Sequence, residues 1–208
     1  MKLLYVLLFL ISSVTVFTQK QTTSTGFIEN KGQIVDQKGK ENLKVKYLLN
    51  TNGLNVQLRE NGFSYDVYEI TKIPLTRKDK ELYPTNPNFD TGIKAPDYSL
   101  KYNFHRIDID FLNSNKNVTL ISSEKSSDYD NYYNVAHVPN GITNVHKFQK
   151  VTYKNIYNNI DVVFFIPKDS TKVVEYNFIV KPGGKVSDIQ LKFNGGKTEL
   201  FDNKIKMN

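Results

Sequence analysis

The residues best suited to hold a ligand lie in a polar, tyrosine-rich stretch over residues 122–134. The candidate ligand-binding side chains are Asp128, Tyr129, Asp130, Tyr132 and Tyr133. Closely spaced carboxylates are oxygen ligands that calcium prefers, and tyrosine offers a sugar an apolar face with a hydroxyl at its edge. The stretch is not an EF-hand, because the sixth and twelfth positions counted from Asp128 are Tyr133 and Pro139 instead of Gly and Glu. We expect a packed loop without a cofactor, and calcium or a sugar is the alternative ligand.

Asp161 and Glu175 are the candidates for an acid–base pair. They fall on two neighbouring expected strands, and a pair of carboxyl groups is what glycosidases use. In the simpler interpretation, Asp161 accepts hydrogen bonds from backbone amides of the Asn158-Asn159 turn and Glu175 lies on an outer strand face. We favour this simpler interpretation.

Metal and nucleophile chemistry have weaker candidates. A metal site would need the three histidines, His105, His137 and His146, to converge from distant segments. Ser126 and Ser127 lack the strand–turn–helix setting of an activated serine. The chain has no cysteine, which excludes disulfides and zinc thiolates. We therefore expect a protein that is not an enzyme.

Strand periodicity runs through most of the chain. Apolar residues alternate over 45–49, 54–58 and 63–67, and the Asn52-Gly53 and Asn61-Gly62 pairs between them favour tight hairpins. Further strands are expected over 102–112, 118–121, 142–148, 189–194 and 198–201. No 3.6-residue period is long enough to predict a helix. The expected fold is all-β, an antiparallel β-sandwich of roughly ten or more strands with long polar loops.

The stretch from Lys147 to Gly184 is predicted to organise the sheet. Apolar residues gather over 151–157 and, after a turn, form an almost unbroken run over 160–166, which is typical of a strand covered on both faces. A third strand is expected over 173–180. In contrast, four prolines interrupt residues 72–98, which predicts a long surface loop that is either a tolerated insertion or functional.

The first 19 residues are typical of an export signal. Lys2 precedes an apolar run from Leu3 to Val16, which small and polar residues follow. We expect a signal peptide over 1–19, a polar leader over 20–25 and a single all-β domain over 26–208; a retained anchor and two β lobes are the alternatives. The protein is thus expected to pass through the periplasm and be secreted or held at the cell surface, with no membrane span once the signal is cleaved.

The formal net charge of +7 does not indicate a nucleic-acid partner. Of the 28 basic residues, 25 are lysines, whereas base recognition relies on arginine. Lysines spread over turns and outer strand faces are typical of a solvated surface. No nucleic-acid partner is expected.

A series of short motifs follows in a characteristic order. The motifs are FIENKGQ at 27–33, VKY at 45–47, VTYKNIY at 151–157, IDVV at 160–163, EYNFIV at 175–180 and IQLKF at 189–193. With them the chain resembles an N-terminal domain of unknown function from large secreted bacterial proteins. Those proteins often carry SBBP (β-propeller-type) repeats and end in a gliding-motility-associated sorting domain of type IX secretion. The resemblance implies no activity, but it implies further modules downstream, so the chain is expected to be truncated at its C-terminal end.

These observations together predict a secreted, non-enzymatic module of a cell-surface or extracellular protein with a structural or adhesive role. Its expected partners are extracellular polysaccharide or cell-surface proteins, with downstream repeat modules if the chain is a fragment. A carbohydrate-binding module is the alternative function, and a secreted glycoside hydrolase is less favoured. The stretches 72–98 and 122–134 are expected to present tyrosines and amides to a partner.

Overall fold

The computed structural model describes residues 25–81, 96–169, 171–202 and 204–207. The expected signal peptide and all but the last residue of the polar leader lie outside the described residues. No helix among the described residues is long and apolar enough to span a membrane.

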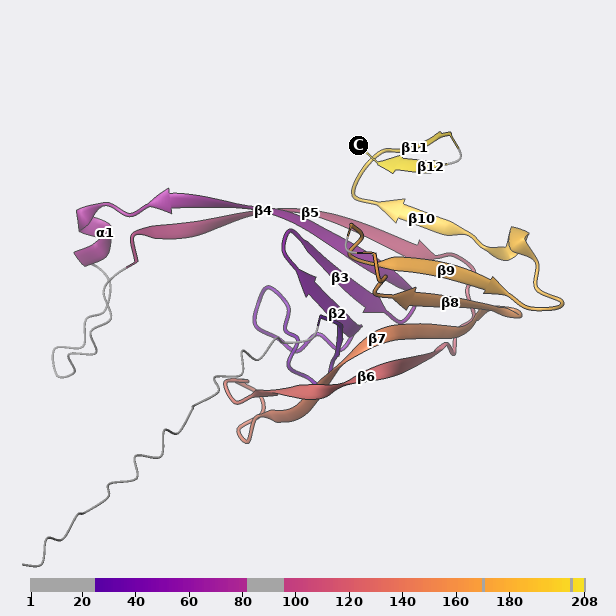
Figure 1. Ribbon diagram of the computed structural model, residues 1–208, viewed down its shortest axis with the longest axis horizontal. Helices are drawn as coiled ribbons and strands as arrows, with labels where there is room; N and C mark the ends of the chain where they lie inside the picture. The colour runs from indigo at the N-terminus through magenta and orange to yellow at the C-terminus, as the bar shows by residue number, and fades with distance from the viewer. Residues whose placement is uncertain (1–24, 82–95, 170, 203, 208) are drawn as a thin grey trace, which may run out of the picture.

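The described residues form an all-β structure (Figure 1), as the sequence predicts. The strands are β1 (Phe27–Glu29), β2 (Val45–Thr51), β3 (Leu54–Arg59), β4 (Gly62–Pro74), β5 (Tyr98–Phe111), β6 (Thr119–Tyr132), β7 (Ile142–Tyr157), β8 (Ile160–Phe165), β9 (Glu175–Val180), β10 (Leu191–Asn194), β11 (Thr198–Phe201) and β12 (Lys204–Met207). Two short helical segments join them, α1 (Arg77–Glu81) and the 3-10 helix η1 (Val186–Asp188).

One continuous antiparallel sheet makes up the body of the molecule. Its strand order is β10-β5-β4-β3-β2-β1-β7-β8-β9, with β6 also paired to β7. The 16-residue β7 serves both halves, because β1 pairs with residues 147–148 and β8 with residues 150–157. The sheet therefore curls over on itself, and its two halves form the two layers expected of a sandwich (Figure 1). Strands β11 and β12 form a separate hairpin.

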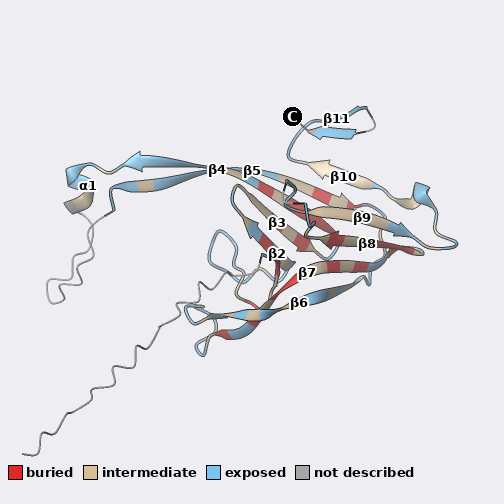
Figure 2. Cartoon of the chain, viewed as in Figure 1, coloured by how far each residue is buried: buried red, intermediate tan, exposed pale blue. Residues whose placement is uncertain are grey.

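The core lies between the two halves of the curled sheet. Phe63 of β4 contacts Phe164 of β8 and Tyr176 of β9, with ring centroids 4.9 Å and 5.1 Å apart. Tyr153 of β7 is fully buried, and its hydroxyl donates to the carbonyl oxygens of Arg59 at 2.8 Å and Gly62 at 3.1 Å. Aromatic pairs of this kind add about 0.5–1.5 kcal/mol each beyond the area they bury. The buried residues gather in this body of the molecule (Figure 2).

The predicted hairpins β2–β3–β4 and β7–β8–β9 are confirmed. Gly53 and Asn159 adopt the left-handed conformation that tight turns require, with φ of +85° and +57°. One detail was wrong, because β8 is fully covered on its core face but only partly covered on its outer face, where Asp161 alone is buried. Its core face is fully buried, whereas Val163 and Phe165 on the outer face are only partly covered, since the sheet has its core on one side.

One of the two expected loops is largely strand, whereas the other loses only its two ends to strands. β4 and β5 continue past the body as a two-stranded arm, which consists of residues 68–74 and 98–104 (Figure 1). The expected loop over 72–98 is thereby shortened, and residues 82–95 of it lie outside the described residues. The expected loop over 122–134 is strand as far as Tyr132, because β6 pairs along β7. Its side chains alternate between half-buried and exposed positions, but most of them are polar. The sequence therefore shows no apolar alternation that would predict a strand there.

Candidate functional site

The two predicted acidic ligands on β6 hold a buried lysine. Lys147 of β7 is 8% exposed, and its Nζ lies 3.1 Å from Asp130 Oδ2 and 3.7 Å from Asp128 Oδ2. A buried ammonium needs such partners, so both carboxylates already have a cation of the protein beside them. Within the described ranges, no three His, Asp or Glu side chains are grouped so that they could hold a metal ion.

The three predicted tyrosines do not form one surface. Tyr129 is 52% exposed and lies against the ring of His146 at 5.7 Å between centroids. Tyr132 is half-buried, and burial and the nearby Asp130 raise the pKa of its hydroxyl. Tyr132 and the exposed Tyr133 line a pocket of about 480 Å³ together with His137. The structure thus brings two of the five predicted residues to a common cavity and the two acids to Lys147.

Asp161 and Glu175 do not form a carboxylate pair. Asp161 lies opposite Ile179 in the β8–β9 ladder, whereas Glu175 lies opposite Phe165, four residues further along β8. At about 3.3 Å per residue this separates the two positions by about 13 Å, beyond the spacing that glycosidases use. Glu175 forms an ion pair with Lys172.

Asp161 is instead the centre of a structural cluster on the outer face of β8. Its carboxylate accepts hydrogen bonds from the Asn155 backbone N–H at 2.8 Å, Lys154 Nζ at 2.9 Å and Lys181 Nζ at 2.8 Å. Burial would raise the pKa of this carboxyl, but the three donors outweigh it and lower the pKa to about 2. The bond to Asn155 lies where the pairing of β7 with β8 shifts register, and Asn155 has a φ of +48° there.

The three histidines lie apart and serve local contacts. His137 Nε2 lies 3.0 Å from the carbonyl oxygen of Gly32. His146 Nδ1 lies within 3.2 Å of the carbonyl oxygens of Ser126 and Asp128, where β6 departs from regular pairing. His105 lies on β5, where that strand leaves the body. The Ser126 hydroxyl donates to the Asp128 carbonyl oxygen at 2.7 Å and accepts a hydrogen bond from the Lys147 backbone N–H at 3.2 Å.

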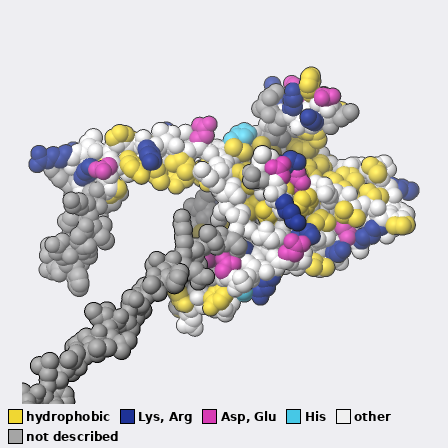
Figure 3. All heavy atoms as spheres, viewed as in Figure 1, with side chains coloured by type: hydrophobic (Ala, Val, Ile, Leu, Met, Phe, Trp, Pro, Cys, Tyr) yellow, Lys and Arg dark blue, Asp and Glu magenta, His cyan; other side chains and the backbone are white. Residues whose placement is uncertain are grey.

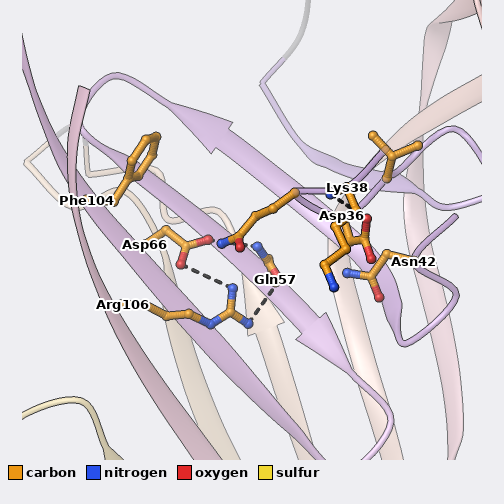
Figure 4. Close-up of a pocket in the computed structure, with 9 residues that line it drawn as sticks. Asp36, Lys38, Asn42, Gln57, Asp66, Phe104 and Arg106 are labelled. Carbon is orange, nitrogen blue, oxygen red and sulfur yellow. Dashed lines mark hydrogen bonds and ion pairs between the residues drawn. The ribbon is translucent and has the colours of Figure 1, made fainter. Parts of the chain in front are cut away.

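A polar network on the outer face of β3, β4 and β5 was not predicted from the sequence. The Arg106 guanidinium lies 3.0 Å from Asp108, 3.0 Å from the Ser64 hydroxyl, 3.3 Å from Asp66 and 3.3 Å from the Gln57 amide oxygen. The Gln57 amide also donates to Asp66 at 2.7 Å. Figure 4 shows Gln57, Asp66 and Arg106 converging from their three strands. Each member is fixed by the others, so the network holds one geometry.

The two carboxyl groups of this network differ in pKa. Burial raises the pKa of Asp66, and Arg106 and Gln57 offset this only in part. Burial acts in the same direction on Asp108, but the Ser64 hydroxyl and Arg106 outweigh it and lower the pKa of that carboxyl. The positive charge of Arg106 is therefore already matched within the protein.

Aromatic rings continue this outer face along the arm. Tyr68 and Phe104 lie directly opposite in the ladder, with ring centroids 5.4 Å apart, and Tyr102 stacks on Phe104 at 5.9 Å with an angle of 13° between the ring planes. Phe104 is 61% exposed and Tyr102 is 45% exposed. Hydrophobic side chains gather along the arm in Figure 3. The alternation of Tyr98, Leu100, Tyr102 and Phe104 in the sequence is the signal that could have found this face.

A pocket of about 450 Å³ lies at the foot of the arm, where the ring face meets the polar network (Figure 4). Gln57, Asp66, Phe104 and Arg106 line it from the sheet, and Val35, Asp36, Gln37, Lys38 and Asn42 line it from a surface turn. That turn is fixed, because Asp36 Oδ1 accepts backbone hydrogen bonds from Lys38 at 2.8 Å and Lys40 at 2.9 Å. The walls combine donors and acceptors with one aromatic rim, an arrangement that can bind and orient a polar ligand.

A family model described as a domain of unknown function (DUF7948) matches residues 27–208, from the first residue of β1 to the end of the chain. The match therefore covers both halves of the sheet, the arm and the pocket. Neither a curated protein nor a solved structure matches the chain.

Proposed function

Because the chain belongs to the DUF7948 family of domains, whose description names no activity, we propose from its geometry that it is a non-enzymatic interaction module with a structural or adhesive role. The partner binds to the outer face of the arm and to the pocket at its foot. The observation that carries this proposal is the aromatic face of the arm, which lies outside the core and is exposed to solvent.

The physical argument concerns the stability of the arm. Apart from the Tyr68 backbone N–H, which donates to the Gly53 carbonyl oxygen at 2.9 Å, residues 68–74 and 98–104 have no third strand beside them among the described residues. A two-stranded hairpin is only marginally stable in water, and large exposed apolar patches on a protein surface commonly mark binding sites. An arm with stacked rings on one face gains its full stability when a partner covers that face.

The proposal also places the module outside the cell. The pattern of residues 1–19 supports export, and the order of the short motifs supports a position at the start of a larger surface protein with SBBP-type repeats and a type IX sorting domain. The module would then act with its downstream repeats as a spacer or an adhesive tip.

Binding without catalysis fits the placement of the acidic residues. Asp161 is engaged by two lysines, and Asp66 is tied into the Arg106 network. Asp108, the acid nearest to Asp66 in that network, is itself engaged by Arg106 and by the Ser64 hydroxyl. The proposed interaction needs no resident cofactor.

The test measures binding of the mature chain to cell-surface material of the organism that makes it. Binding is expected to fall at least ~10-fold in the double variant Tyr102→Ser, Phe104→Ser, because exposed aromatic anchors dominate interface energies. Tyr129→Ser is the matched control, since it removes a similarly exposed ring from β6 and should leave binding unchanged. Equal binding by all three proteins, or none by the unaltered chain, would refute the proposal.

A second candidate function is carbohydrate binding at the pocket beside Tyr132 and Tyr133. The observation that favours it is that this cavity of about 480 Å³ also contains Asn131, Asn134 and His137, so amides and rings line it together. Tyr133→Ser should abolish sugar binding if this pocket is the site. Retention of sugar binding in that variant would remove this candidate.

A further inference from the structure

We propose that the ring face of the arm and the pocket at its foot bind a neutral polysaccharide. The sugar rings lie along Tyr102 and Phe104, and one sugar enters the pocket between Arg106 and Asn42. This inference rests on the proposed function, because it uses the same surface and names the chemical class of the ligand.

The ring geometry favours a chain ligand over a single small molecule. Tyr102 and Phe104 are nearly parallel neighbours on one strand. Tyr68 lies at one side of this row, with its ring centroid 5.9 Å from that of Tyr102 and 5.4 Å from that of Phe104. The same face continues outward through Ile70 and Leu100, which are 43% and 46% exposed. A pyranose has an apolar C–H face that packs on aromatic surface, and successive sugars of a chain can use successive parts of such a row.

The pocket has the polarity that hydroxyl groups need. Gln57 and Asp66 present an amide and a carboxylate to the cavity from the sheet, and Asn42 presents an amide from the facing turn (Figure 4). Among the described residues the Asn42 side chain has no hydrogen-bond partner, while its residue is half-buried. A sugar hydroxyl, which both donates and accepts, would satisfy that amide. Phe104 lines the pocket and also belongs to the row of rings, so a single polysaccharide chain can occupy the pocket and the ring face together.

The balance of charge favours a neutral ligand. Two acids, Asp36 and Asp66, and two bases, Lys38 and Arg106, line the pocket, so the formal charges of its lining cancel. Arg106 already has Asp66 and Asp108 as partners, together with two neutral acceptors. An acidic chain would have to displace these carboxylates, whereas a neutral chain can add hydrogen bonds to them.

The experiment uses the full mature chain in affinity electrophoresis with glucan, xylan and galactomannan as neutral probes and alginate as the acidic probe. At least one neutral probe is expected to retard the protein, and high salt should not remove the effect. Phe104→Ser and Asn42→Ala should each weaken retardation at least ~10-fold. Tyr129→Ser should leave it unchanged. Retardation by alginate alone, or loss with Tyr133→Ser instead of Phe104→Ser, overturns the inference.

A second readout separates this inference from the proposed function. Cell-surface material is treated either with periodate, which cleaves sugar diols, or with protease, and is then tested for Phe104-dependent binding. Loss after periodate alone supports the polysaccharide. Loss after protease alone leaves the interaction module standing and overturns the polysaccharide. If no Phe104-dependent binding exists before treatment, both proposals fail.

Discussion

Replacing Asp161 with asparagine is expected to lower the free energy of unfolding at neutral pH and to have a much smaller effect near pH 2. The carboxylate is 3% exposed and accepts hydrogen bonds from one backbone N–H and from Lys154 and Lys181. An asparagine is close in shape but carries no charge. The variant therefore loses the attraction to both lysines while it keeps the volume of the side chain.

The magnitude follows from the pKa. The folded protein lowers the pKa of Asp161 from 3.8 to about 2. At about 1.36 kcal/mol per pKa unit, the ionised form contributes about 2 kcal/mol at most, since both lysines are partly exposed and water screens them. Because the folded-state pKa is the lower one, this stability is present above pH 3.8, declines below it and is lost as the pH falls through about 2.

The assay is urea unfolding of the unaltered chain and of Asp161→Asn between pH 7 and pH 2, with the difference taken at each pH. Other carboxyl groups affect both proteins equally, so the difference isolates Asp161. Adding Lys154→Met to each protein completes a double-mutant cycle, and the coupling should vanish over the same pH interval. A difference that stays constant from pH 7 to pH 2 would show that packing, and not charge, accounts for the effect.

Three further outcomes test the core and the lysine cluster. Tyr153→Phe should cost about 1–2 kcal/mol in urea unfolding, because two buried carbonyl oxygens lose their shared hydroxyl donor; no loss would contradict the role of that hydroxyl. Gly62→Ala should cost about 2 kcal/mol or more, because a Cβ there would lie 2.4 Å from the Ile109 carbonyl oxygen and must push β4 from β5; a stability equal to that of the unaltered chain would refute the close approach. Millimolar calcium should leave the thermal midpoint of the unaltered chain unchanged but raise that of Lys147→Met, where Asp128 and Asp130 lose their ammonium. A calcium-induced rise in the unaltered chain would point to an ion at those acids.

The parts of the fold that the sequence predicts well are those where apolar alternation and turn chemistry agree. Asn52-Gly53 and Asn158-Asn159 lie between strands that each bury one face, so period and turn indicate the same hairpins. These hairpins include β8, whose core residues are fully buried. The local sequence pattern does not predict how the sheet closes. Closure requires β1 to pair with β7, which places Phe27 opposite Phe148, a residue far away in the sequence.

The candidate site could not be predicted from the sequence, for two physical reasons. Pro74 and its neighbours interrupt the pattern as a loop would, yet Pro74 occurs where β4 ends and its missing N–H disturbs no inner ladder. The outer face of the sheet is polar, so Gln57, Asp66 and Arg106 look like ordinary solvated positions in the sequence. Their convergence depends on the register of three strands, which a single sequence does not specify.

The sharing of β7 between the two halves of the sheet affects when the protein can fold. β1 needs Phe148 and Lys147 as partners, and the second half of the sheet needs the rest of β7. Closure thus waits until most of the chain is present, and such distant pairings fold slowly. If the chain is exported as we propose, this delay would keep the polypeptide unfolded while it crosses a membrane, and the curled sheet would close only after β7 has crossed.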